Sequence, residues 1–200
     1  MKNFLKVTIL AAGLVICLNA SSFAQVDVAV YGGYVFSGTV EVTEEGLPSY
    51  DVDFSATQFG IKGHYNIEMS PAVTLGLGVF YQSEKVDPDD WGGGSKPKRT
   101  SLGADVAFLF SMDSAAVFPY VRLYCAYDKL KIWGESAPGV GFGIGGGLEY
   151  AINTNIRLFG ELMYEAAAWE KDIDWGYGYE ENLKANASQI GLNVGLKFVF

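Results

Sequence analysis

The sequence of 200 residues contains only two cysteines, Cys17 and Cys125, and a single histidine, His64. After residue 24 no apolar stretch approaches the roughly 20 residues that a membrane-spanning helix requires. Basic residues are also scarce, because 14 Lys and Arg stand against 23 Asp and Glu, for a formal net charge of −9. These deficits exclude a disulfide-rich domain and a bundle of membrane helices, and they argue against nucleic acid as a partner.

The first 24 residues have the layout of a secretory signal peptide. Lys2 and Lys6 precede an apolar run over residues 7–18, and a short segment rich in small residues ends at Ala24. We therefore expect export, cleavage after Ala24, and a single domain over residues 25–200. Two of the basic residues and none of the acidic ones lie in the leader, so this domain carries a formal net charge of −11.

The cysteines set two further expectations. Cys125 is the one cysteine of residues 25–200, so no disulfide can form within that domain. Lipid attachment at Cys17 is the alternative to simple cleavage of the leader. Ile16 precedes Cys17, however, where lipid attachment sites carry a small residue.

The last twelve residues alternate between apolar and small or polar side chains. In an extended strand successive side chains point to opposite faces, so one face carries six apolar residues: Ile190, Leu192, Val194, Leu196, Phe198 and Phe200. A soluble protein would leave this ladder and a free strand edge exposed. In a membrane the ladder would face lipid, and because unpaired backbone groups are costly in hydrocarbon, the strand requires partners that close into a barrel.

The same alternation recurs along the chain. Strands are predicted over eight segments: 26–37, 54–66, 72–83, 101–110, 120–127, 141–150, 156–164 and 189–200. Long polar connections over 39–53, 84–98, 128–138 and 166–186 alternate with short turns, which is typical of outer-membrane barrels. The sequence therefore predicts an all-β protein, an eight-stranded antiparallel up-and-down transmembrane β-barrel.

Alternation alone does not distinguish this barrel from a soluble, lipocalin-like barrel with its apolar side inside. The less apolar face of each segment consists mainly of Gly, Ala, Ser, Thr and Asn, with about one charge per strand. That is too few charges for a surface in water. It suits a narrow interior that side chains fill.

Seven charged residues are predicted to point into this interior: Lys62, Asp105, Arg122, Glu149, Arg157, Glu161 and Lys197. If the fourth and fifth strands fold symmetrically about residues 113–114, Asp105 lies opposite Arg122. Symmetry about residue 153 likewise places Glu149 opposite Arg157. Asp27 is expected to meet Lys197 where the last strand closes on the first. An eight-stranded interior is only wide enough for side chains, so we expect paired charges to fill it.

These features together resemble the small outer-membrane β-barrel family, which includes the transmembrane domain of outer membrane protein A, outer membrane protein X and the opacity-type, porin-family proteins. The resemblance rests on the leader, the alternating strands, the glycine-rich stretch 139–150 and the terminal Leu-Lys-Phe-Val-Phe. It implies a Gram-negative outer membrane, both termini in the periplasm and four surface loops. It also implies that Leu196, Phe198 and Phe200 act as the signal read by the barrel-assembly machinery.

Neither catalysis nor a cofactor or metal is expected. His64 is predicted to face inward beside a short turn, where an interior hydrogen bond is favoured over the catalytic role that a lipid-modifying barrel enzyme would need. Gly141, Gly143 and Gly146 match a dinucleotide-binding pattern, but no helix follows them, so we interpret them as the lining of a narrow barrel.

The remaining candidates for a functional site lie in the predicted loops, which combine acidic residues with aromatic ones. The aromatic contact candidates are Trp91, Trp169, Trp175, Tyr177 and Tyr179. We expect a monomer anchored in outer-membrane lipid, with a structural or adhesion-like role in membrane integrity or in contact with a host or cell-surface ligand. The alternatives are a solvated acidic rim without a ligand, a narrow pore for small solutes and a lipid-modifying enzyme.

Overall fold

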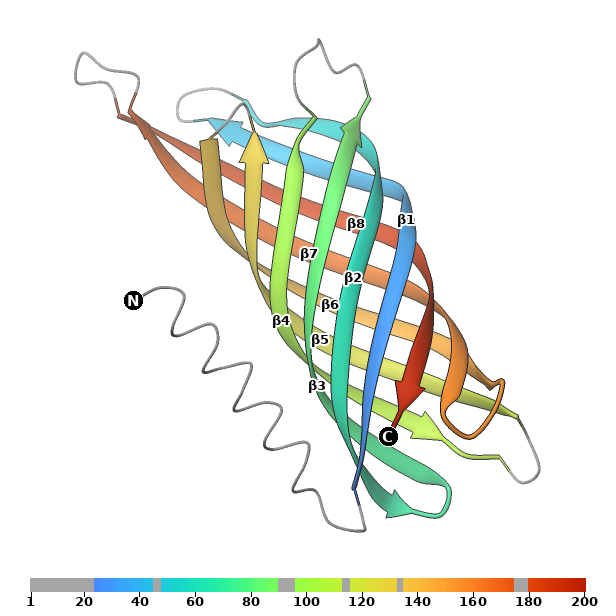
Figure 1. Ribbon diagram of the computed structural model, residues 1–200. Helices are drawn as coiled ribbons and strands as arrows, with labels where there is room; N and C mark the ends of the chain where they lie inside the picture. The colour runs from blue at the N-terminus through green and yellow to red at the C-terminus, as the bar shows by residue number, and fades with distance from the viewer. Residues whose placement is uncertain (1–23, 45–47, 90–95, 113–115, 133–134, 175–179) are drawn as a thin grey trace.

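The computed structural model describes residues 24–44, 48–89, 96–112, 116–132, 135–174 and 180–200. Within these residues the chain forms eight strands that close into one barrel, as the sequence predicts (Figure 1). Their bounds are β1 Ala24–Glu44, β2 Tyr50–Ser70, β3 Val73–Pro88, β4 Lys98–Phe110, β5 Val117–Ile132, β6 Glu135–Ala151, β7 Ile156–Asp174 and β8 Glu180–Val199. No helix in the described part of the chain is long and apolar enough to cross a membrane.

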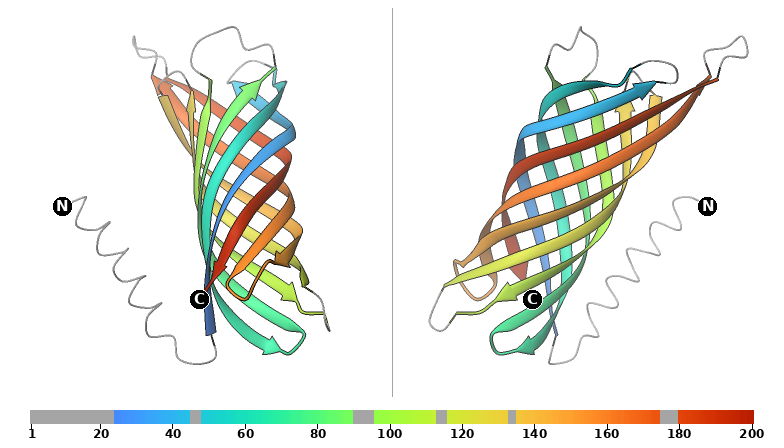
Figure 2. Two further views of the ribbon diagram at one scale, coloured as in Figure 1. Left: turned by 45° about the vertical axis from the view of Figure 1, so that its right-hand side comes forward. Right: turned by 180° about the vertical axis from the view of Figure 1, so that it is seen from behind.

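Each strand pairs antiparallel with its neighbours in sequence, and β8 pairs with β1 to close the ring. The closing register runs from Asp27 opposite Val199 to Glu44 opposite Leu183. The start of β1 and the end of the chain lie at the same rim, which also holds the connections β2–β3, β4–β5 and β6–β7 (Figure 1). We call this the turn rim, and the opposite end the loop rim. The two views of Figure 2 show the strands inclined to the barrel axis.

The predicted alternation of side chains is confirmed along all eight strands. Inward residues are buried and outward residues are exposed; in β8, for example, Lys197 is 3% exposed and its neighbour Phe198 is 37% exposed. On every strand the exposed outer face carries large apolar or aromatic residues, mostly Val, Leu, Ile, Phe and Tyr. A wall this apolar is compatible with lipid and not with water.

The strands extend beyond the sequence-based boundaries at the loop rim, so the predicted connections were too long. β3 continues to Pro88, β5 continues to Ile132 and β7 continues to Asp174. The polar and acidic residues that suggested loops instead occupy both faces of strands that rise out of the apolar belt. Outward ones meet water, while inward ones such as Glu84 and Asp128 are buried inside the barrel.

Aromatic residues inside the barrel are matched by glycines. Each of the seven buried aromatic residues among the described residues has a glycine as a cross-strand partner. The pairs are Tyr31–Gly60, Phe54–Gly38, Phe80–Gly103, Tyr120–Gly147, Tyr124–Gly143, Phe159–Gly195 and Trp169–Gly139. A Cβ at Gly195 would meet the Val30 carbonyl oxygen and the Phe159 ring. The glycines thus leave the space that the rings fill.

Gly195→Ala tests this complementarity. The added methyl has to displace backbone at the β8–β1 closure, so the free energy of unfolding is expected to fall by about 1–3 kcal/mol. Urea unfolding of the barrel in lipid vesicles measures it. Gly160→Ala is the matched control, because nothing lies within 4 Å of a Cβ at Gly160. Equal stability of the two variants would contradict the packing argument.

Candidate functional site

The interior of the barrel is organised around the carboxylate of Glu161, which is 1% exposed. Its oxygens accept hydrogen bonds from Lys62 Nζ at 3.2 Å, the Tyr120 hydroxyl at 3.0 Å and Arg122 Nη1 at 3.2 Å. The amide of Asn193 donates to it at 3.2 Å. These donors come from β2, β5 and β8, while Glu161 belongs to β7. One buried carboxylate therefore ties together strands on several sides of the barrel.

Towards the turn rim, His64 lies between two carboxylates. Its Nδ1 is 2.9 Å from Asp27 Oδ1, and its Nε2 is 3.1 Å from Asp105 Oδ2. Arg122 Nε also donates to Asp105, which links this group to Glu161. Both ring nitrogens are engaged and the side chain is buried, so the predicted interior hydrogen bond of His64 is confirmed.

The turn rim itself is closed by a second carboxylate, Glu149 of β6. It accepts hydrogen bonds from Lys197 and, at 3.1 Å, from Arg157 Nη1. Lys197 Nζ lies 3.4 Å from Asp27 Oδ2 as well. These contacts connect β6, β7, β8 and β1, so the ends of the sheet are joined by side chains as well as by backbone hydrogen bonds.

A third group of charges lies nearer the loop rim, around the guanidinium of Arg99. It contacts the carboxylates of Glu84 at 3.8 Å, Asp128 at 2.5 Å and Glu165, and lies 5.3 Å from the centre of the Trp169 ring. Tyr124 donates to Glu165 at 2.9 Å, and Gln189 donates to Glu84 at 3.2 Å.

The sequence-based reading missed Glu84, Arg99, Asp128 and Glu165 because it placed the strand ends too early. The sequence nevertheless indicates that these four residues point inward. Each lies two residues along its strand from a position that the alternation places inside the barrel; Glu84, for example, follows Gln82. Continued alternation would have identified all four.

A chain of hydrogen bonds between neutral side chains crosses the middle of the barrel. The Tyr31 hydroxyl donates to Gln82 at 2.9 Å, Gln82 donates to Gln58 at 2.8 Å, and Gln58 donates to Asn193 at 2.5 Å. Asn193 then donates to Glu161. The polar interior is therefore one connected network rather than isolated pairs.

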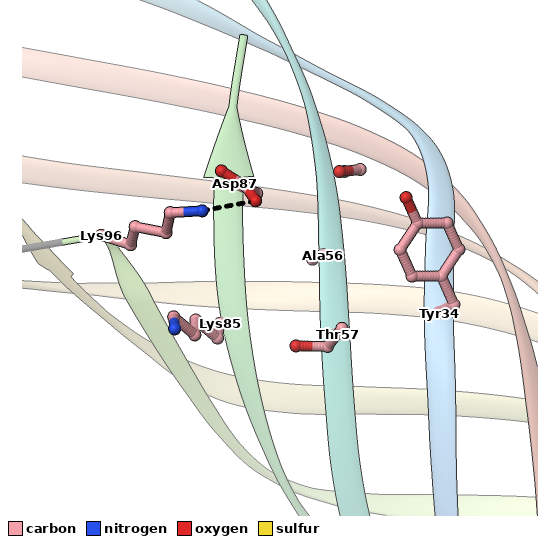
Figure 3. A pocket seen from close by; sticks show the side chains of 7 residues that line it. Tyr34, Ala56, Thr57, Lys85, Asp87 and Lys96 are labelled. Carbon is pink, nitrogen blue, oxygen red and sulfur yellow. Dashed lines mark hydrogen bonds and ion pairs between the residues drawn. The ribbon is translucent and has the colours of Figure 1, made fainter. Parts of the chain in front are cut away.

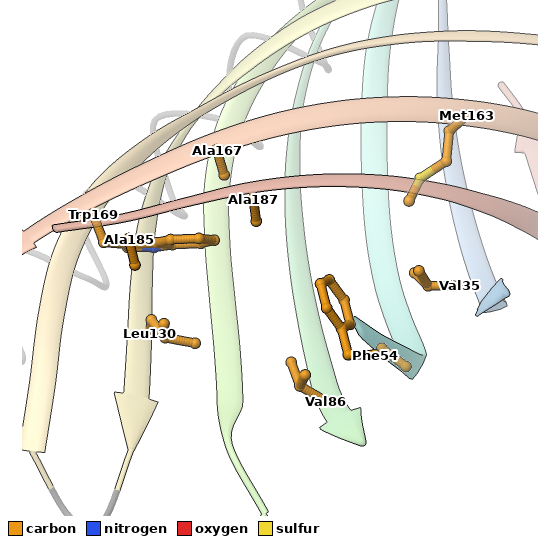
Figure 4. Packing of buried hydrophobic residues seen from close by; sticks show 10 residues of the cluster. Val35, Phe54, Val86, Leu130, Met163, Ala167, Trp169, Ala185 and Ala187 are labelled. Carbon is orange, nitrogen blue, oxygen red and sulfur yellow. The ribbon is translucent and has the colours of Figure 1, made fainter. Parts of the chain in front are cut away.

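The loop-rim end of the interior is filled by apolar side chains (Figure 4). The cluster consists of Val35, Phe54, Ala56, Val86, Leu130, Met163, Ala167, Trp169, Ala185 and Ala187, all buried. In Figure 4, Phe54 and Val86 lie side by side on the neighbouring strands β2 and β3, and Leu130 of β5 belongs to the same cluster. Together with the polar network below it, this cluster makes the interior of the described strands a packed core rather than an open water channel.

The seven charges predicted to point inward all do so, but two of the predicted registers are wrong. Asp105 lies opposite Tyr124, and Arg122 lies opposite Ala107. Glu149 likewise faces Phe159 rather than Arg157. The ion pairs form diagonally, because an arginine side chain reaches the neighbour two residues along the partner strand. The contact between Asp27 and Lys197 is diagonal as well.

Trp169 is a correction to the predicted contact surface. It belongs to β7, points inward and is 5% exposed, so it packs in the apolar cluster instead of facing a ligand. The other four contact candidates, Trp91, Trp175, Tyr177 and Tyr179, lie outside the described residues. Leu196, Phe198 and Phe200, the predicted assembly signal, are exposed on the outer face.

A pocket of about 50 Å³ opens at the turn rim beside Asp27, Asn66 and Arg157. Another, of about 230 Å³, lies on the outer side near the loop rim (Figure 3). Among the described residues, no group of three or more His, Cys, Asp or Glu side chains is arranged to hold a metal ion.

A closed ring of eight strands with an apolar outer wall and a packed polar interior defines a small transmembrane β-barrel. The chain belongs to the outer membrane protein β-barrel domain family, whose model matches residues 8–198. It is therefore an outer-membrane protein of the small eight-stranded type.

Solved structures include similar barrels. The outer membrane protein OprG from Pseudomonas aeruginosa is 12% identical, with a TM-score of 0.55 over 90% of this chain and 96% of that chain. Neisserial surface protein A is 18% identical, with a TM-score of 0.47 over 86% and 97%. Ail, the attachment invasion locus protein of Yersinia pestis, is 15% identical, with a TM-score of 0.40 over 90% and 100%. A search of curated proteins finds no match. The likeness to OprG supports the fold alone.

The pairing of Lys62 with Glu161 can be measured. Among the described residues, Glu161 is the only carboxylate in an ion pair with Lys62, so Glu161→Gln leaves a buried ammonium without its counter-charge. We expect a loss of about 3 kcal/mol or more in the free energy of unfolding, measured by urea titration in lipid vesicles.

The control for that experiment is the double variant Glu161→Gln with Lys62→Met. It removes both charges and should recover part of the loss. The single variant Lys62→Met is measured as well. If the loss of stability in the double variant equals the sum of the losses in the two single variants, Lys62 and Glu161 do not interact, and the pairing is wrong.

Trp169→Ala tests the correction to the contact surface. Removing a buried indole from the apolar cluster should lower the free energy of unfolding by about 3–5 kcal/mol. Adherence of folded protein to cells should not change, because the ring does not reach the surface. Unchanged stability together with lost adherence would restore the exposed position expected from the sequence.

Proposed function

We propose that this protein is a surface-interaction protein, in which the barrel is a membrane anchor and the loop rim provides the contact surface. The observation that carries the proposal is the length of the β7–β8 hairpin. β7 pairs with β6 only as far as Trp169, opposite Gly139, whereas it pairs with β8 up to Asp174, opposite Glu180. The hairpin therefore projects beyond the point where β6 leaves it (Figure 2).

The projecting part of β7 has a free edge. From residue 171 to residue 174 its backbone pairs with β8 on one side and not with β6 on the other. A free edge can accept an added strand from another protein through backbone hydrogen bonds. This arrangement supports an extended protein segment as the partner.

The negative charge of the β7–β8 hairpin supports a positively charged partner. Residues 170–184 contain five acidic and two basic residues in the sequence Glu-Lys-Asp-Ile-Asp-Trp-Gly-Tyr-Gly-Tyr-Glu-Glu-Asn-Leu-Lys. On a chain that is acidic overall, this hairpin would attract a basic segment and repel an acidic one. The proposed partner is thus an extended, basic stretch of a host or neighbouring-cell surface protein.

Two alternatives lack a supporting observation. A pore requires a continuous water path, but inward side chains such as Phe159, Met163 and Glu161 are almost fully buried. A lipid-modifying enzyme requires an accessible nucleophile or base, whereas His64 is buried between two carboxylates. The proposed function therefore gives His64 no catalytic role.

Shortening the hairpin tests the proposal. Replacing residues 171–183 by Asn-Gly joins Glu170 to Lys184, which already face each other across the hairpin. Bacteria carrying this variant should lose most adherence to an epithelial monolayer, while the unboiled protein keeps the altered gel mobility of a folded barrel.

The matched control shortens another loop-rim connection. Replacing residues 43–49 by Asn-Gly joins Val42 to Tyr50, which are also cross-strand partners. This control should adhere like the unaltered protein. Full adherence of the first variant, or equal loss in both, would overturn the assignment of the contact surface to the β7–β8 hairpin.

A further inference from the structure

Three lysines form a continuous row on the outer face of the barrel near the loop rim. Lys85 of β3 lies directly opposite Lys98 of β4, and Lys98 lies directly opposite Lys131 of β5. We call these three residues the lysine row. Their side chains are exposed, as are those of Lys96 and Lys129 beside them. A chain with few basic residues therefore gathers five of its lysines on one side of one rim.

The lysine row lacks counter-charges of its own. Like charges directly opposite each other in a sheet are destabilising. Among the described residues, no carboxylate forms an ion pair with Lys85, Lys98 or Lys131; of this group only Lys96 has one, with Asp87 at 2.6 Å. A row of this kind is stabilised if an anion from outside the chain lies against it.

The position of the row indicates where that anion comes from. On the same three strands, Tyr81 faces Leu102, which faces Tyr127, and all are exposed. Each lysine of the row stands four residues nearer the loop rim on the same face, about 13 Å along the strand. Exposed aromatic residues mark the membrane–water interface of such barrels. The lysines therefore lie just beyond it, at the depth of lipid headgroups.

A pocket continues the row on its β2 side. Lys85 faces Thr57, and Thr57 faces Tyr34, so two hydroxyl-bearing residues extend the line of ammonium groups. Figure 3 shows these side chains with Lys96 and Asp87 around the pocket of about 230 Å³. Ammonium and hydroxyl donors together suit the oxygens of a phosphate group.

We propose that the lysine row and this pocket bind the phosphate groups of phosphorylated lipids in the outer leaflet. The ammonium and hydroxyl groups lie on the side wall of the barrel, directly beyond the lipid-facing belt. A site for a soluble polyanion would instead consist of groups that point away from the membrane. The inference rests on the proposed function only in placing the loop rim at the outer surface.

The test uses the purified barrel in neutral detergent micelles, with diphosphorylated lipid A as the probe and native mass spectrometry to count retained lipid. The variant combines Lys85→Gln, Lys98→Gln and Lys131→Gln. A lysine near a charged membrane surface contributes about 1 kcal/mol, so affinity for lipid A should fall roughly a hundredfold. Lys184→Gln, an exposed lysine on β8, is the control and should retain lipid like the unaltered protein.

A second measurement separates binding from loss of folding. Without lipid, the triple variant should unfold at the same temperature as the unaltered protein or a higher one, because mutual repulsion is relieved. Added lipid A should raise the unfolding temperature of the unaltered protein and not that of the variant. Dephosphorylated lipid and inorganic phosphate should have little effect on the unfolding temperature of either protein, because the proposed site binds a phosphate group that belongs to a membrane lipid.

Equal retention of lipid A by the unaltered protein and the triple variant would overturn the proposal. So would retention of a heparin fragment in place of lipid A, which would assign the row to a soluble polyanion. The experiment contains no cells, and the triple variant leaves the β7–β8 hairpin unchanged. Failure of lipid binding and failure of cell adherence are therefore separate results.

Discussion

In hydrocarbon, a backbone amide or carbonyl without a hydrogen-bond partner costs several kcal/mol, and the pairing of β8 with β1 removes that cost for the whole sheet. The rest of the molecule depends on this closure. It gives every strand within the barrel two neighbours, and it encloses an interior that water does not fill. The side chains of that interior must then satisfy one another, which explains why Glu161, Glu149 and Arg99 each contact partners from several strands.

Packing inside so narrow a ring requires small residues opposite large ones. The seven glycines across from buried aromatic rings meet this requirement, and they allow rings and charged groups to share the same space. Arg122, for example, lies within 4.7 Å of the ring centres of Phe80 and Tyr124 while it pairs with Glu161. A packed interior supplies rigidity, which suits the proposed role of the barrel as an anchor. The residues free to contact other molecules are those at its outer face and loop rim.

That surface carries charges of opposite sign in two different places. The β7–β8 hairpin is acidic and projects past the barrel, and the lysine row of β3–β5 lies at the headgroup level on another part of the wall. A basic patch beside phosphorylated lipid and an acidic sheet away from it would hold the barrel in the bilayer while presenting the hairpin to a partner. Both features follow from strands that extend beyond the thickness of the hydrocarbon.

The alternation of side chains determined, from sequence alone, the number of strands, the face each residue occupies and the apolar outer wall, because a period of two is a local property of an extended chain. Only the tertiary structure decided the strand ends, the register and the partners. Polar residues such as Glu84 and Asp128 resemble loop residues until closure buries them, and Trp169 resembles an exposed aromatic for the same reason. The lysine row depends on the pairing of three strands, which no local pattern specifies.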